Sequence, residues 1–171
     1  MKKTIKLLNY QLVVMLVFLT SCGFEDMEDN CSAEELTTIW NTNEEILIAY
    51  DTRYERYDYT VVSGNKLVFS YNDFISNSCL GLFEERNLFF QIEDPGEAFE
   101  FIDDEILTTN CFYRLEGGYL NGATHLFSKG TISGEKIAED TWKIDVNIEG
   151  DSLYQNGKGE AIVFSHYFFA N

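Results

Sequence analysis

This chain of 171 residues is poor in the residue types on which most catalytic and metal sites depend. It has two histidines and one proline, and no Cys-x-x-Cys pair that would indicate a zinc or redox-active thiol site. It also lacks the Gly-x-Ser-x-Gly nucleophile motif, both phosphate-binding glycine patterns and the His-Glu-x-x-His zinc motif. We therefore expect a protein that is not an enzyme and that carries no cofactor.

Basic residues are the second shortage. There are 12 Lys and Arg against 29 Asp and Glu, which gives a formal net charge of −17. Such a surface repels phosphate backbones, so nucleic acid is excluded as a partner. Because 14 Phe, 10 Tyr and two Trp require burial, the chain is not a disordered acidic tail.

The N-terminus contains the longest uninterrupted apolar run. Lys2, Lys3 and Lys6 precede an apolar stretch at residues 12–19. That stretch is too short to span a bilayer, which takes about 20 apolar residues in a helix. A basic start, a short apolar run and small residues after it predict a cleavable signal peptide over residues 1–21.

The end of this leader carries a specific motif. Leu19-Thr20-Ser21-Cys22 resembles the lipobox of bacterial lipoproteins. The resemblance implies a diacylglyceryl thioether on Cys22 and cleavage just before it, with membrane attachment through the lipid. An ordinary cleaved signal with a chance cysteine is the alternative.

The residues after Cys22 refine the expected location. Gly23 stands where an Asp would retain the protein in the inner membrane, and an acidic stretch follows at residues 24–29. This stretch resembles the export signal that some Gram-negative phyla use for surface lipoproteins; a solvated acidic linker is the alternative. We expect residues 22–32 to be an acidic lipidated tether, on the outer membrane of a Gram-negative bacterium and exposed at its surface.

The mature chain would be more acidic still. The leader holds three of the 12 basic residues and none of the acidic ones, so nine basic residues face 29 acidic ones and the net charge is −20. Anionic headgroups repel such a domain, so the lipid is expected to make the membrane contact.

Residues 33–171 read as a single antiparallel β domain of many short strands. Ser32 and Glu35 match a capping box, and Leu36, Ile39 and Trp40 recur at helical spacing, which predicts a short helix over residues 33–41. The fold class expected is all-β: an antiparallel, calycin-like barrel or a β-sandwich, with this short N-terminal helix.

Three strand predictions are specific. Trp142, Ile144, Val146 and Ile148 alternate with polar residues, so residues 141–149 should be a strand with one buried face. Ser63-Gly64-Asn65 separates two strand patterns and predicts a hairpin turn. Residues 158–169 are apolar on both faces, as in a strand that is covered on both sides.

A fainter resemblance concerns the start of this domain. Leu36-x-x-x-Trp40, ahead of the first strand pattern, is similar to the Leu-x-Gly-x-Trp that opens lipocalin-like barrels. Thr38 stands where that family has Gly, and no second motif of the family follows. The resemblance favours a barrel over a sandwich and implies no ligand.

Cysteine pairing and calcium binding are two further hypotheses. Of the cysteines after Cys22, Cys79 and Cys111 are the preferred disulfide pair, because Cys31 sits near the tether; buried free thiols are the alternative. Asp103, Asp104 and Glu105 supply the hard oxygen ligands that calcium prefers, but they do not follow the EF-hand pattern; a solvated loop is the favoured alternative, and no metal is expected.

The functional hypotheses follow from the tyrosines and the acids. Tyr54, Tyr57 and Tyr59 alternate with charged residues and could form a binding surface, the alternative being a half-buried sheet face. The leading hypothesis is a non-enzymatic binding or accessory module for a small ligand, a glycan or a protein. The alternatives are a structural subunit of a larger surface complex and a glycoside hydrolase that uses paired acids.

Overall fold

The computed structural model describes residues 32–53, 56–117, 123–150 and 161–171, and this part of the chain is all-β, as the sequence predicts. Its strands and its short 3₁₀ helix follow one another as β1 (Ser32–Asp51), β2 (Arg56–Asn77), β3 (Leu82–Ile92), β4 (Ala98–Ile102), η1 (Asp103–Thr109), β5 (Phe112–Gly117), β6 (Ala123–Ala138), β7 (Thr141–Gly150) and β8 (Ala161–Ala170).

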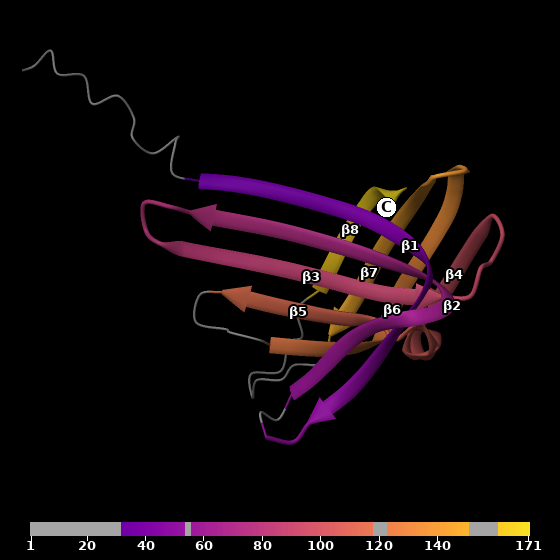
Figure 1. Cartoon of the computed structure of the whole chain (residues 1–171), viewed down its shortest axis with the longest axis horizontal. Coiled ribbons are helices and arrows are strands. Elements are labelled where there is room, and N and C mark those ends of the chain that lie inside the picture. Colours follow the sequence, from indigo (N-terminus) through magenta and orange to yellow (C-terminus); the bar gives the residue numbers. More distant parts are fainter. Residues whose placement is uncertain (1–31, 54–55, 118–122, 151–160) are drawn as a thin grey trace, which may run out of the picture.

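The strands form one sheet that curls into an incomplete barrel. The order is β4-β6-β5-β3-β2-β1-β8-β7, and β7 also pairs with β6. All neighbours are antiparallel except β1 and β8, which are parallel and meet at only two residue pairs, Ile39–Phe169 and Trp40–Ala170. In Figure 1 β1 and β8 lie together near the C-terminus and then diverge, so the sheet is not closed between them.

The interior is filled by aromatic side chains. Phe69 of β2 is fully buried and contacts Phe90, Trp142 and Phe168, with ring centroids 4.8, 5.9 and 5.8 Å away. Ile106 of η1 is also fully buried in this cluster, so the short helix closes one end of the core. Large aromatic side chains supply most of the hydrophobic stabilisation of such a core.

The β1–β2 hairpin bends sharply in the middle, where the sequence predicts a turn. β2 does not reverse at Ser63-Gly64-Asn65: it runs on to Asn77, and Glu44 of β1 faces both Ser63 and Lys66. The turn-forming residues are therefore a bulge, and the predicted hairpin is wrong. A Cβ on Gly64 would lie 2.9 Å from the carbonyl oxygen of Glu44, so only glycine fits this close approach.

Beyond the bend, the hairpin covers the outer face of β3 and β5. Ile46 is fully buried, its amide donates to Oε1 of Gln91, and Asn110 Nδ2 donates to the Ile46 carbonyl at 3.0 Å. Tyr59 packs on Phe89 and Phe112. Ile46 and Phe112 do not belong to the main core cluster, so the chain builds a second, smaller core outside the sheet.

The predicted N-terminal helix is wrong, because residues 33–41 lie within β1. They pair in register with β2, from Ala33 opposite Ser76 to Asn41 opposite Val68. The helical spacing of Leu36, Ile39 and Trp40 competes with the β-branched Thr37, Thr38 and Ile39, which favour a strand, and long-range pairing with β2 decides the outcome.

Two strand predictions remain, for β7 and β8; the first is confirmed and the second is wrong. In β7, Trp142, Ile144, Val146 and Ile148 are all buried, as the alternation predicts. In β8 only one face is covered in the described structure: Val163 is 69% exposed and Phe169 53% exposed. The expectation of a strand covered on both faces is therefore wrong.

Replacing Ile46 by Ala tests the second core. The lost side chain leaves a cavity, so the free energy of unfolding should fall by about 2–5 kcal/mol. Leu47, the next residue, is 51% exposed, and Leu47→Ala should cost about 0.5 kcal/mol or less. Urea unfolding of the purified chain, followed by tryptophan fluorescence, measures both. Equal effects of the two substitutions would contradict a buried core beneath the bent hairpin.

Candidate functional site at the sheet tip

Two of the three tyrosines of the predicted binding surface lie in the described residues, and they differ in exposure. Tyr54 lies outside the described residues, and Tyr57 is 37% exposed and pairs edge-on with Tyr50, with centroids 5.1 Å apart. Tyr59 is half-buried, and this burial raises the pKa of its phenol. Tyr59 is thus a packing residue, and only the Tyr50–Tyr57 pair is left as an exposed platform.

The predicted Cys79–Cys111 disulfide is wrong. Cys111 is a free thiol, 2% exposed, whereas Cys79 is disulfide-bonded. Cys79 lies in the turn before Leu82, and Cys111 adjoins Phe112, which pairs with Phe89. Seven residues of β3 between those points span about 23 Å, well beyond the roughly 7 Å that a disulfide can bridge. Burial raises the pKa of the Cys111 thiol, which behaves as a small apolar side chain.

Two of the three acids named as calcium candidates accept backbone hydrogen bonds. Glu105 Oε2 accepts from the Ile102 amide at 3.1 Å, and Asp103 Oδ1 accepts from the Gly130 amide at 2.9 Å. Within the described residues no group of three acidic, His or Cys side chains could hold a metal ion.

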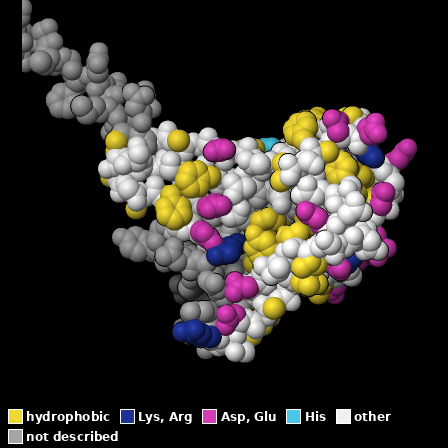
Figure 2. All heavy atoms as spheres, in the orientation of Figure 1, with side chains coloured by type: hydrophobic (Ala, Val, Ile, Leu, Met, Phe, Trp, Pro, Cys, Tyr) yellow, Lys and Arg dark blue, Asp and Glu magenta, His cyan; other side chains and the backbone are white. Residues whose placement is uncertain are grey.

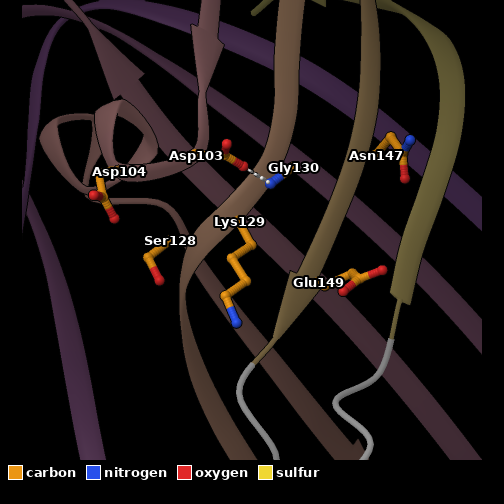
Figure 3. A pocket seen from close by; sticks show the side chains of 7 residues that line it. All are labelled: Asp103, Asp104, Ser128, Lys129, Gly130, Asn147 and Glu149. Atoms are coloured by element: carbon orange, nitrogen blue, oxygen red, sulfur yellow. Dashed lines mark hydrogen bonds between the residues drawn. The ribbon is translucent and has the colours of Figure 1, made fainter.

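Asp103 and Asp104 line a surface pocket between η1, β6 and β7 (Figure 3). The side chains drawn there are polar or charged, and Asp103 points to the backbone of β6. The other residues that line the pocket are Ser128, Lys129, Gly130, Asn147 and Glu149. With carboxylates on two sides and one ammonium group, the pocket has no single charge that would select a ligand.

A more distinctive surface lies where β1, β2 and β3 extend past β8. We call it the sheet tip: residues 32–38 of β1, 71–77 of β2 and 82–88 of β3. Cross-strand partners share a face of the sheet. Trp40, Phe69 and Phe90 are partners in the core, so the inward face of the tip carries the partners Leu36, Asp73 and Arg86 and, next along, Glu34, Ile75 and Glu84.

Apolar side chains on this inward face are exposed. Leu36 is 44% exposed, Ile75 36% and Leu82 54%. β8 reaches only to the edge of the tip, where Phe164 stacks on Tyr71 with centroids 4.2 Å apart and an angle of 9° between the rings. The inward face therefore begins as core at Tyr71 and ends as open surface at Ile75.

A buried carboxylate lies at the boundary between core and open surface. Asp73 is 8% exposed, and its Oδ2 lies 3.8 Å from Nη1 of Arg86, which donates from Nε and Nη2 to Glu84 at 2.6 Å. The other oxygen, Asp73 Oδ1, is buried without a hydrogen-bond partner. Leaving such an acceptor buried and unsatisfied costs free energy.

Tyr71 adds a second polar group to this boundary. Burial raises the pKa of its phenol, and the charge of Asp73 raises it further. The hydroxyl is thus protonated at neutral pH and available as a donor or acceptor.

The outward face of the tip is apolar as well. Phe74 stacks on Phe83 with centroids 6.3 Å apart, and Phe83 is 46% exposed. Figure 2 shows hydrophobic side chains at this end of the sheet with acidic side chains around them. Beside them Asn72 donates to Asn87 Oδ1 at 2.6 Å and to Glu85 Oε1 at 2.7 Å, which fixes the register of β2 and β3.

Sequence reasoning missed the sheet tip because a helix was expected over Leu36. Residues 73–76 read Asp-Phe-Ile-Ser and residues 83–86 read Phe-Glu-Glu-Arg, so neither segment shows the strict alternation that indicates a half-buried strand. Nothing in those residues reveals that β8 ends short of them, since this depends on how far β1 and β8 diverge.

Comparisons with known proteins add no family. No protein-family model, no curated protein and no solved structure matches this chain. In the described residues no helix is long and apolar enough to cross a membrane, while the predicted leader and Cys22 lie outside them. A function must therefore be argued from the sheet tip.

The corrected cysteine assignment is testable by alkylation. Without reductant, the native chain at pH 8.5 should take up iodoacetamide at Cys111 only after unfolding, because burial disfavours the thiolate. Cys111→Ala should keep the disulfide that involves Cys79, and Cys79→Ala should lose it, as seen by mass spectrometry before and after reduction. Loss of the disulfide in Cys111→Ala would instead support the Cys79–Cys111 pair that the sequence predicts.

Proposed function

We propose that this chain is a lipoprotein anchored in the outer membrane through Cys22, and that its folded domain is a non-enzymatic module that binds a protein partner at the sheet tip. The lipobox and the acidic stretch after it support the anchor and the surface location. The observation that carries the binding function is the sheet tip, which exposes apolar side chains on both faces beside a buried, unpartnered carboxylate oxygen.

A protein partner suits this surface better than a small ligand does. The interior of the incomplete barrel is occupied by Trp40, Phe69, Phe90 and Trp142, whereas small-molecule sites are concave apolar pockets. The tip is an extended sheet end with both faces accessible. Exposed apolar side chains surrounded by polar ones are typical of surfaces that bind other proteins.

The anchor is tested by Cys22→Ala. The chain should then appear as uncleaved precursor or in the soluble fraction, and should no longer incorporate a labelled fatty acid, because the thiol that receives the lipid is gone. Cys111→Ala is the matched control and should remain in the membrane fraction. Protease added to intact cells should remove the domain. Unchanged membrane retention of Cys22→Ala would contradict the anchor, and full protection from protease would contradict surface display.

The binding surface is tested by photocrosslinking in intact cells. A benzophenone amino acid at Leu36 or at Leu82 should give the same crosslinked partner, because both side chains point to the inward face of the tip. The matched control is Leu47, on the bent part of β1, which is 51% exposed. The same products from all three positions would show that contact at the tip is not specific.

A further inference from the structure

One edge of β8 is unpaired over most of its length. β8 pairs with β7 from Ala161 to Phe169, but on its other side it meets β1 only at Phe169 and Ala170. In the residues that the structure describes, no strand adjoins positions 161–168 on that side. β1 is likewise unpaired on that side before Ile39, so the two open edges meet only at this junction; we call the space between them the wedge.

The hydrogen bonds around the C-terminus show which backbone groups face the wedge. The amide of Ala170 donates to Asp140 at 2.9 Å on the β7 side, and the amide of Asn171 donates to Trp40 at 3.1 Å on the β1 side. Thr38 Oγ1 donates to the carbonyl of Tyr167 at 2.6 Å, also from the β1 side. Because strand groups alternate in direction, the N–H and C=O groups of Val163, Ser165 and Tyr167 point into the wedge.

This edge lacks the features that normally block strand pairing. Residues 161–170 contain no proline and no Lys, Arg, Asp or Glu. Exposed edges are usually protected by charges, proline, bulges or short length, and an unprotected edge over residues 161–168 is a template for another strand.

The inward face of the sheet tip borders the same wedge. Phe164 of β8 stacks on Tyr71, and Asp73 and Ile75 continue β2 beyond that stack. A strand laid along the free edge of β8 would therefore pass beside the exposed Leu36 and Ile75, at the boundary where Asp73 is buried.

Charge selects the kind of strand. Glu34, Asp73 and Glu84 stand on the inward face against Arg86 alone, and the whole chain has a net charge of −17. A second copy of the chain would bring the same charge to the edge, whereas a strand with Lys or Arg would meet opposite charge.

We propose that an extended, basic segment of a partner polypeptide adds to the free edge of β8 as a new strand, with a Lys or Arg side chain facing the acidic residues Glu34, Asp73 and Glu84 of the tip. This rests on the proposed binding function and names its mode: main-chain hydrogen bonds at Val163, Ser165 and Tyr167 give affinity, and Leu36, Ile75 and Asp73 give selectivity.

The probe is a nine-residue peptide that alternates Val and Lys, labelled with fluorescein and titrated with the purified full chain in detergent. The control peptide has the same sequence with N-methyl groups on alternate amides, so it keeps the charge but loses the edge donors. We expect the first to bind and the second to bind at least about tenfold more weakly, since each lost hydrogen bond costs about 0.5–1.5 kcal/mol.

Variants of the chain make the test specific. Val163→Pro removes an amide that faces the wedge and spares the ladder to β7, so it should weaken the peptide about tenfold, while Val163→Ala should bind as the parent does. Asp73→Asn should weaken the Val–Lys peptide and leave a Val–Ser peptide unchanged. Hydrogen exchange should show the amides of 163, 165 and 167 exposed in the free chain and protected in the complex.

The outcomes are separable from those of the proposed function. Equal binding of the methylated peptide, or no protection at 163, 165 and 167, overturns strand addition even if crosslinks form at Leu36 and Leu82. A dimer of the chain alone that Val163→Pro dissolves would make a second copy the occupant, and would likewise overturn the proposal. If Val163→Pro does not fold, the methylated peptide and the hydrogen-exchange pattern of the parent chain still test whether the peptide adds as a strand.

Discussion

The bend of the β1–β2 hairpin is the constraint on which the rest of the structure depends. A single sheet has two faces to bury, and this chain has no long helix in its described part to cover either one. The bulge at Glu44 and Gly64 turns the far half of the hairpin back over β3 and β5, where Ile46 is fully buried. The first half of this hairpin therefore packs on the main core inside the sheet, and its second half covers the smaller core outside it.

The bend lies next to the place where the barrel is incomplete. β1 and β8 share only two residue pairs, at Ile39 and Trp40, just before the bulge, and on the side of Ser32 β1 pairs with β2 alone. The inner core is sealed at this junction by Trp40, whose indole Nε1 donates to the Asp140 carbonyl at 3.1 Å. Beyond the seal, the inward face of the tip is left uncovered by β8.

Local patterns in the sequence predict the structure correctly where one buried face of a strand determines it. They fail where pairing with a distant strand determines it. Trp142 to Ile148 alternate over a buried face, so β7 could be read directly. Ser63-Gly64-Asn65 has turn composition in both a hairpin and a bulge, and only the length of β1 opposite distinguishes them. Leu36 to Trp40 fit a helix locally, but the ladder with β2 outweighs that preference. The position of Cys79 relative to Cys111 depends on the whole register of β3, which no spacing of cysteines reveals.

The acidic surface of the chain explains how the edge of β8 can lack charged residues. An unprotected edge on a neutral protein would pair with the same edge of another copy and aggregate. Here the like charges of two copies repel within a Debye length of roughly 8 Å at physiological salt. This repulsion opposes pairing between copies, which lysines or prolines on the edge strand prevent in other proteins. Repulsion of this kind leaves the edge accessible to a partner of opposite charge. A net charge of −17 then favours a basic strand over a second copy without any residue of β8 itself being charged.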